Sequence, residues 1–345
     1  MSDRKYDLIL ASLLGGAMGD SLGAEIEFWP LRDIRGHFPE GLTELPPHDG
    51  RRGAITDDTQ MTLFTAEGLI TAILRQDARG ICDPVSVVHH ALLRWLKTQE
   101  ISPRMQVDSG GLLADQRLHR RRAPGNTCLS SLAAAERFGD TARNDSKGCG
   151  AIMRVAPVAF LNGANHVQLA MGCSALTHGH VAGQEAAAAW ASILSAAFRG
   201  NDVEEAARSL LGRFRIETDN ALRAALDAPR DGKPETIEDL GGGWVAEEAL
   251  AIALYSVLAA NGFEHGLRIA VTHSGDSDST GAIAGNLLGL CYPDEVLAHR
   301  WRTQLECLDL IEVIAHDLWL AAHAGSGRGF GCNPEAELRG RYAGY

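Results

Sequence analysis

The sequence predicts an all-α protein, a compact bundle of many short and medium helices that forms one domain over residues 1–345. Apolar residues recur at i, i+3 and i+4 through most of the chain, which is the period of an amphipathic helix. Alanine and leucine are abundant, whereas alternating runs of β-branched residues are scarce. The chain shows no strand–turn–strand signal and no alternation of strands with helices, which disfavours a sheet-based fold.

Seven segments carry the helical period, and the loops between them indicate one domain. Loops rich in Gly, Pro, Asp or Ser are expected at 39–53, 99–111, 139–150 and 229–243. Each lies next to a sharper motif, and none resembles a domain linker. The tail 325–345, which begins with GSGRGFG, is expected either to be flexible or to wrap the surface. Helices are expected over residues 8–24, 58–76, 84–98, 181–198, 245–260, 276–290 and 294–322.

Composition and charge exclude several classes of protein. Acidic residues number 44 and basic residues 32, giving a net charge of −12, which argues against nucleic-acid or anionic-membrane binding as the main role. The seven cysteines include no C-x-x-C pair, as expected for free thiols in a reducing compartment. The longest apolar runs, 186–191 and 249–254, are shorter than the ~20 residues that span a bilayer. Although residues 8–18 resemble part of a signal peptide, we expect a cytoplasmic protein.

Two of the predicted helices carry glycines in an unusual register. Residues 15–23 contain three glycines at intervals of four, and so do residues 281–289, so each trio lies on one helix face. A glycine inside a helix costs about 1 kcal/mol relative to alanine. The trios therefore indicate close backbone approach to another helix or to a ligand, and they suggest that the two helices bring their acidic ends together.

Those acidic ends are the strongest chemical signal in the sequence. The run TDDT at 56–59 opens one amphipathic helix, and GDSDSTG at 275–281 opens the second glycine-faced helix. Helix capping explains one residue at each place but not closely spaced acids at both, because neighbouring carboxylates repel without a cation. Carboxylates and hydroxyls are ligands for Mg²⁺, Mn²⁺ or Ca²⁺. The candidate metal ligands are Thr56, Asp57, Asp58, Asp276, Asp278 and Ser279.

Four weaker motifs leave an ordinary structural explanation open. Glu27 follows a glycine-rich helix and adjoins apolar residues, so its carboxyl group is either an acid or base with a raised pKa or an exposed helix end. The loop 146–150 either cradles phosphates or is an ordinary turn, and it lacks the spacing of a P-loop. The THGH run at 177–180 offers no third zinc ligand. The basic island 117–122 is either a solvated face or an anion-attracting rim.

Taken in order, the motifs resemble the ADP-ribosylglycohydrolase family, which includes the dinitrogenase reductase-activating glycohydrolases and the ADP-ribosylarginine hydrolases. The resemblance covers most of the chain. It is carried by GAMGDSLGAEIEF (16–28), TDDTQMTLFTAEGL (56–69), GCGAIMRVAPVAF (148–160), THGH (177–180), GGGWVAEEALAIALY (241–255) and THSGDSDSTGAIAGNLLG (272–289).

The resemblance implies an all-helical fold that holds two Mg²⁺ or Mn²⁺ ions and hydrolyses a glycosidic bond between ADP-ribose and an acceptor, often a protein side chain. It implies that the six candidate ligands hold the metals and that Glu27 lies beside them, in catalysis or gating. Asp57 and Asp276 are accordingly expected to be catalytic as well as metal-binding.

The resemblance also implies a set of substrate-binding residues. The family's D-I-G-N turn best matches Asp108, although the surrounding V-D-S-G-G departs from that form. The glycine-rich loop is expected to contact the diphosphate and ribose, and His178 and Trp244 are expected to face the ligand and the adenosine half. The expected loop contacts are Ser146, Gly148, Cys149 and Gly150.

These expectations combine into one functional hypothesis. Ser279 within GDSDST resembles the arginine-type members, so the expected substrate is ADP-ribosyl-arginine on a protein partner, with ADP-ribose as the product. Other linkages, to serine, a nucleic-acid base or a small molecule, stay open. So do an ADP-ribose-binding module without turnover, a purely structural helical protein, and a di-metal phosphohydrolase that acts on a nucleotide.

Overall fold

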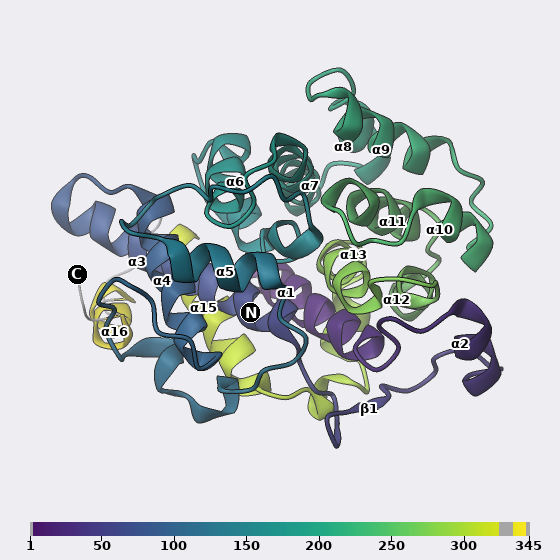
Figure 1. The fold of residues 1–345 in the computed structure, drawn as a ribbon, viewed down its shortest axis with the longest axis horizontal. Coiled ribbons are helices and arrows are strands. Elements are labelled where there is room, and N and C mark those ends of the chain that lie inside the picture. The colour runs from purple at the N-terminus through teal and green to yellow at the C-terminus, as the bar shows by residue number, and fades with distance from the viewer. Residues whose placement is uncertain (1–2, 324–333, 343–345) are drawn as a thin grey trace.

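The computed structural model describes residues 3–323 and 334–342, and it confirms the all-helical, single-domain prediction (Figure 1). Five 3₁₀ turns and one two-stranded hairpin complete the described chain. The α-helices are α1 (Arg4–Gly23), α2 (Leu31–His37), α3 (Asp57–Arg79), α4 (Pro84–Thr98), α5 (Asn126–Ala134), α6 (His166–Ala175), α7 (Val181–Phe198), α8 (Val203–Arg208), α9 (Ile216–Asp227), α10 (Pro234–Leu240), α11 (Ala246–Leu258), α12 (Phe263–Val271), α13 (Ser277–Cys291), α14 (Pro293–Leu297), α15 (Leu308–His323) and α16 (Pro334–Arg341).

Short elements account for the differences from the sequence prediction. The segment 294–322 is not one helix, because the chain turns between α14 and α15 around η5 (Arg302–Gln304) and Cys307, which has φ 56°. The loop expected at 229–243 contains α10, and α16 lies within the expected tail, of which 325–333 and 343–345 fall outside the described residues. The remaining 3₁₀ turns are η1 (Gly111–Ala114), η2 (Gln116–Leu118), η3 (Cys149–Ala151) and η4 (Ala156–Phe160).

A small hairpin was also missed. Strands β1 (Pro47–His48) and β2 (Arg51–Arg52) pair antiparallel around Asp49 and Gly50, which have φ 49° and 72°. Two consecutive positive φ values are typical of a type I′ turn, and Asp-Gly is a favoured sequence for it. The dipeptide was therefore a signal for this turn.

Helices α1 and α13 make the most intimate contact in the described chain, and they lie side by side near the centre of Figure 1. A Cβ atom built on Gly19 would lie 2.0 Å from the carbonyl oxygen of Gly281, and one on Gly15 would lie 2.3 Å from that of Gly285. The two predicted glycine faces thus pack against each other, backbone against backbone. Because both helices are buried almost all round, this pair forms the core on which the other helices pack.

The basic segment, the cysteines and the apolar helices can each be compared with what the sequence predicted. Two arginines of the basic island are used in ion pairs: Arg122 is buried between Glu306 and Asp49, and Arg117 pairs with Asp115 and Asp309. An anion-attracting rim at 117–122 is therefore not supported by these two arginines. Six cysteines in the described part of the chain are free. Among the described residues, none of the helices combines the length and the apolar character needed to cross a bilayer.

The α1–α13 contact gives a stability prediction. Gly19→Ala should lower the free energy of unfolding by about 1–3 kcal/mol, because the new methyl group forces two backbones apart. Gly36→Ala is the matched control, since a Cβ there meets nothing within 4 Å and Gly36 lies in helix α2. That change should leave stability unchanged or raise it by up to about 1 kcal/mol. Urea denaturation measures both, and equal effects of the two substitutions would contradict the proposed role of the contact.

Candidate active site and metal centre

A cavity of about 330 Å³ lies where the N-termini of α3 and α13 meet. The chain segments that form it are far apart in the sequence, and the glycine contact holds the two central helices in register beneath them. Both acidic runs therefore reach one site. The cavity is lined by Glu27, Phe28, Asp57, Asp58, Ala123, Pro124, Gly125, Asn126, Thr127, Cys128, Gly148, Cys149, Gly150, Met153, His178, Trp244, Asp276, Asp278 and Ser279.

The first acidic run is fixed by a capping residue and by a buried aspartate on α1. Thr56 is the N-cap of α3, and its hydroxyl oxygen accepts a hydrogen bond from the Asp58 N–H at 3.3 Å. Asp20 accepts hydrogen bonds from the N–H of Thr56 at 3.0 Å and from the hydroxyl of Thr59 at 2.5 Å. Asp20 thus ties α1 to the start of α3. Sequence reasoning did not include it among the site residues, although it lies in the glycine-faced GDS run.

The second acidic run is fixed at the start of α13. Asp276 is the N-cap residue, and its Oδ1 accepts a hydrogen bond from the Ser279 N–H at 3.2 Å. The same N–H also donates to Asp278 Oδ1 at 3.0 Å. The Cys149 thiol donates to Asp276 Oδ2 at 2.8 Å, which brings the glycine-rich loop against this run. Capping therefore explains Thr56 and Asp276, but it does not explain Asp57, Asp58 or Asp278.

The carboxylates of this cluster have no compensating positive charge among the described residues. Ligand oxygens of Glu27, Asp276 and Asp278 lie within 4.8 Å of one another. Within residues 3–323 and 334–342, no Lys, Arg or His nitrogen lies within 4.0 Å of a carboxylate oxygen of these three acids or of Asp57 and Asp58. Buried acids without a counter-charge are costly, because neither solvent nor a partner offsets their repulsion.

The raised pKa values of these acids reflect the same unfavourable burial and repulsion. Burial is the main cause that raises the pKa of Asp57, Asp58 and Asp278 well above the usual range, and the charges of neighbouring aspartates add to it. Burial, then the charges of Asp276 and Asp57, raise the pKa of Glu27 from 4.5 to about 8.

The donor set fits divalent metal ions. The buried oxygen Asp58 Oδ1 has no hydrogen-bond partner in the described chain, although buried polar atoms are usually paired. Carboxylate and hydroxyl oxygens are hard ligands that suit Mg²⁺ and Mn²⁺. The residues that would hold such ions are the predicted set, Thr56, Asp57, Asp58, Asp276, Asp278 and Ser279, with Glu27 beside them.

Next to the acids, the glycine-rich loop and a buried histidine form another wall of the cavity. The loop is tied to the segment before α11 by the Cys149 N–H, which donates to the Trp244 carbonyl at 3.2 Å. Ser146 does not line the cavity; its hydroxyl lies 3.2 Å from that of Thr127 and supports the loop from behind. Gly148, Cys149 and Gly150 do line it, as does His178.

His178 is held as a neutral imidazole. Arg154 donates to the Thr177 hydroxyl oxygen at 2.8 Å, and that hydroxyl lies 2.8 Å from His178 Nδ1. The Thr177 hydroxyl and Nδ1 share this hydrogen bond, and Nε2 is the ring atom that faces Gly148. Burial and the Arg154 charge lower the pKa of His178 to about 3. The side chain thus presents a neutral imidazole to the cavity.

Asp108 is not brought to this site. It lies beside a different cavity, where it pairs with Arg94 and His90. The loop that does line the cleft is A-P-G-N-T at 123–127, and its Gly125 N–H lowers the pKa of Asp57. The Gly-Asn pair at 125–126 matches the second half of the expected D-I-G-N turn, so the pair was the signal for this loop. Ala123, with φ 47°, stands where that form has its aspartate.

Two exposed aromatic side chains flank the cavity. Phe28 and Trp244 stack with ring centroids 5.0 Å apart, and they are 66% and 41% exposed. Phe28 has φ 69°, an uncommon backbone conformation for an aromatic residue, and it directly follows Glu27. The strain is consistent with a position held for function. Trp244 was predicted to contact ligand, whereas Phe28 was noted only as an apolar neighbour of Glu27.

The fold and the site define a class: an all-helical protein that gathers unpaired carboxylates at two helix N-termini beside a glycine-rich loop. The sequence matches the family model described as ADP-ribosylglycohydrolase over residues 1–327, so the chain belongs to the ADP-ribosylglycohydrolase family.

Individual relatives agree with this assignment. The chain is 24% identical over 317 residues to ADP-ribosyl-[dinitrogen reductase] glycohydrolase of Rhodospirillum rubrum, covering 87% of this chain and 91% of the relative. It is 26% identical over 335 residues to ADP-ribosylarginine hydrolase Tri1 of Pseudomonas putida, covering 92% and 79%. A solved structure titled ADP-ribosylglycohydrolase-related protein complex superposes with a TM-score of 0.65 at 28% identity, covering 92% of this chain and 99% of the other.

The raised pKa of Glu27 predicts the pH dependence of the metal-free protein. The unfolded chain loses this proton near pH 4.5 and the folded chain near pH 8, so the stability it confers is present below pH 4.5 and is lost as the pH rises to about 8. The melting temperature should therefore fall between about pH 5 and pH 8, and Glu27→Gln should reduce this fall.

Added Mg²⁺ or Mn²⁺ should raise the melting temperature more at about pH 8 than at about pH 5.5, because metal binding displaces protons. Circular dichroism melting curves in metal-free and metal-containing buffers measure both effects. A melting temperature that rises over this range without metal would contradict the electrostatic description of the cluster.

Proposed function

We propose that this protein is a divalent-metal-dependent hydrolase that cleaves the glycosidic bond between ADP-ribose and an acceptor and releases ADP-ribose. The observation that carries the proposal is the cluster of buried carboxylates without a basic partner, at the N-termini of α3 and α13. Membership of the ADP-ribosylglycohydrolase family supports the same reaction class.

The acids and the loop have separate tasks in this proposal. Divalent metal ions, when bound, would supply Lewis-acid chemistry and neutralise the aspartates. Glu27, which lies beside Asp276 and Asp278 and is only partly buried, is the carboxylate that can still exchange protons with water. Burial and then the charges of Asp276 and Asp57 raise its pKa, so neutralising these aspartates would lower the pKa of Glu27 and favour its ionised form. Glu27 then takes the proton from the attacking water.

In this proposal, the wall formed by the glycine-rich loop and His178, together with the aromatic pair, binds the ADP-ribose part of the substrate. In its Nε2–H tautomer His178 donates to an oxygen of the ribose or diphosphate, and burial together with the Arg154 charge keeps the imidazole neutral. Gly148 and Gly150 keep this wall open, because a Cβ on either would lie 3.2–3.3 Å from the imidazole ring. The exposed pair of Phe28 and Trp244 provides aromatic surface for the adenosine half.

ADP-ribosyl-arginine is the acceptor linkage that we propose. One relative is named an ADP-ribosylarginine hydrolase, and the GDSDST run resembles the arginine-type members of the family. An ADP-ribosylated protein would then be the natural partner.

A second candidate, an ADP-ribose-binding protein with little or no turnover, is favoured by one observation. Ala123 places a methyl group where the expected D-I-G-N form has a carboxylate, on the loop that contacts Asp57. Under this second candidate the cleft binds ADP-ribose but lacks one group that the reaction needs.

Substitution of the acids tests the hydrolase proposal. Asp57→Ala and Asp276→Ala should each abolish release of ADP-ribose and weaken metal binding, since each removes a buried carboxylate from the cluster. Glu27→Gln should lower kcat by about 10²–10⁴-fold while retaining metal binding. Glu25→Gln is the matched control, because Glu25 is partly exposed, pairs with His48, and does not line the cavity. Full activity of the Asp variants, or of wild type in EDTA, would refute the proposal.

Product analysis separates the acceptors and the two candidate functions. Arginine-, serine- and nucleic-acid-linked ADP-ribose are incubated with the protein, with and without Mg²⁺ or Mn²⁺, and the products are identified by mass spectrometry. We expect metal-dependent ADP-ribose release from the arginine-linked substrate. Tight binding of ADP-ribose without release, together with turnover gained by Ala123→Asp, would establish the second candidate instead. Release of inorganic phosphate or a nucleoside phosphate would indicate a phosphohydrolase.

A further inference from the structure

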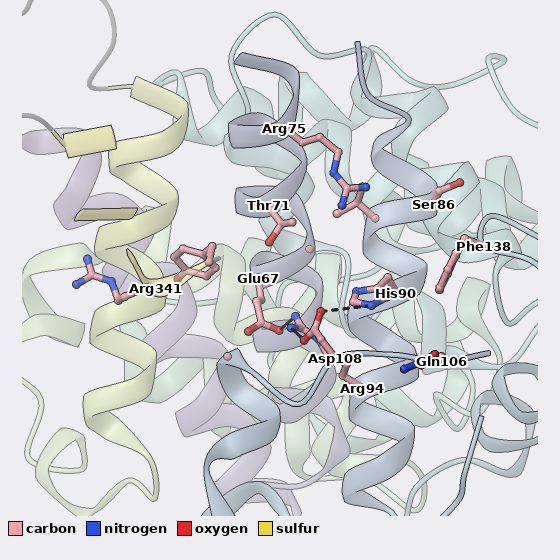
Figure 2. Close-up of a pocket in the computed structure, with 14 residues that line it drawn as sticks. Glu67, Thr71, Arg75, Ser86, His90, Arg94, Gln106, Asp108, Phe138 and Arg341 are labelled. Carbon is pink, nitrogen blue, oxygen red and sulfur yellow. Dashed lines mark hydrogen bonds and ion pairs between the residues drawn. The ribbon is translucent and has the colours of Figure 1, made fainter. Parts of the chain in front are cut away.

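A second polar cavity, of about 300 Å³, lies along the groove between α3 and α4, outside the candidate active site. Each helix contributes three polar residues at intervals of four, so each trio follows one helix face. In Figure 2 Arg75 extends from α3 toward α4 and His90 from α4 toward Asp108, whereas the Ser86 side chain points away from α3. The trios are Glu67, Thr71 and Arg75 on α3 and Ser86, His90 and Arg94 on α4.

At the end of the groove near Arg94, the charged side chains pair with one another. Arg94 pairs with Glu67 and donates to Asp108 Oδ1 at 2.9 Å, and Glu67 also accepts from the Leu112 N–H at 2.8 Å. His90 Nε2 lies 3.5 Å from the other oxygen of Asp108. The two carboxylates at this end are therefore both engaged, and they are not available to Arg75.

The other end carries a cation without a counter-ion. Arg75 extends from α3 toward α4 (Figure 2), and it makes no hydrogen bond or ion pair with any residue in the ranges 3–323 and 334–342. Its Nε atom is shielded from solvent and has no acceptor, and the same holds for Nε of Arg94. Buried N–H donors normally find acceptors, so an acceptor is missing from this cavity.

The cavity also has an aromatic rim. Phe138 lines it, is 44% exposed, and stands edge-on to His90 with ring centroids 5.3 Å apart. Val87 adds apolar surface on α4. The cavity thus combines one free guanidinium with an apolar wall, which is the pattern of a site for a small amphiphilic ligand.

We propose that this second cavity binds a small organic anion, whose carboxylate or phosphate group contacts Arg75 and whose apolar body contacts Phe138. A guanidinium group presents a planar fork of donors that matches both of these anionic groups. Thr71 lies one helical turn from Arg75 on the same face and offers a hydroxyl to the same group. The site is distinct from the cleft, because Glu67 lies about 13 Å along α3 from Asp58 at 1.5 Å per residue.

Isothermal titration calorimetry with four probes tests the proposal: acetate, benzoate, inorganic phosphate and phenyl phosphate. The full-length protein is titrated in resin-treated, metal-free buffer, so that the acidic cleft repels anions. We expect benzoate or phenyl phosphate to bind at one site, more tightly than acetate or phosphate. A preference for benzoate identifies a carboxylate ligand, and a preference for phenyl phosphate identifies a phosphate monoester.

Matched variants assign the binding to this cavity. Arg75→Gln should weaken binding about 10- to 100-fold, and Arg75→Lys should weaken it less, because the charge is kept without the fork. Arg79→Gln, which removes an exposed charge one turn further along α3, should have no effect. Phe138→Ala should weaken the two phenyl-bearing probes only. Melting curves check that each variant is folded. Absence of binding by wild type, or equal losses in Arg75→Gln and Arg79→Gln, would overturn the proposal.

Discussion

The backbone contact between α1 and α13 is the constraint on which the cleft depends. With glycine at each crossing point, the carbonyl oxygens of one helix lie where the other would carry Cβ atoms. This closeness brings Gly23, at the end of α1, against Ser277, at the start of α13. Asp20 on the same helix then holds the start of α3. One packing contact therefore sets the separation between the two acidic runs, and any side chain added within it would move them apart.

The carboxylates of the cavity are electrostatically unfavourable in the folded protein. Four buried aspartates and Glu27 share one cavity, and the raised pKa values show that burial and mutual repulsion oppose their ionisation. Elsewhere the same protein compensates its buried acids carefully: Glu67 has Arg94, and Glu306 has Arg122. The cavity acids differ from these two, because no basic side chain of the described residues pairs with them. The uncompensated carboxylates of the cavity lower the stability of the folded protein. A divalent cation bound among them would offset this loss.

The sequence predicted what is encoded by local periodicity and short motifs. It predicted the helical class, six of the seven amphipathic segments, a close backbone approach at the two glycine faces, and the meeting of residues 56–58 with 276–279. It missed short helices such as α10, whose seven residues carry too little periodic signal. It matched Asp108 to the cleft because an isolated Asp-x-Gly resembles many turns, whereas only the tertiary fold shows that loop 123–127 reaches Asp57. The pairing of Arg94 with Asp108 likewise depends on a contact between elements that no local pattern specifies.

The residue at position 123 and Glu27 both affect the balance between the carboxylate charges of the cavity and the cations it would hold. Asp57, Asp58, Asp276 and Asp278 carry four negative charges when ionised, which two divalent cations would balance. A carboxylate at position 123 would add a fifth charge near Asp57, whereas the methyl group present adds none. Under the proposed function, Glu27 is then the acid that is neither fully buried nor needed to balance the ions, so we expect the reaction to depend on it more heavily than in a cleft with an aspartate on that loop. The left-handed backbone at Ala123 is one that aspartate adopts more readily than alanine, which makes the exchange sterically compatible with the loop as it stands.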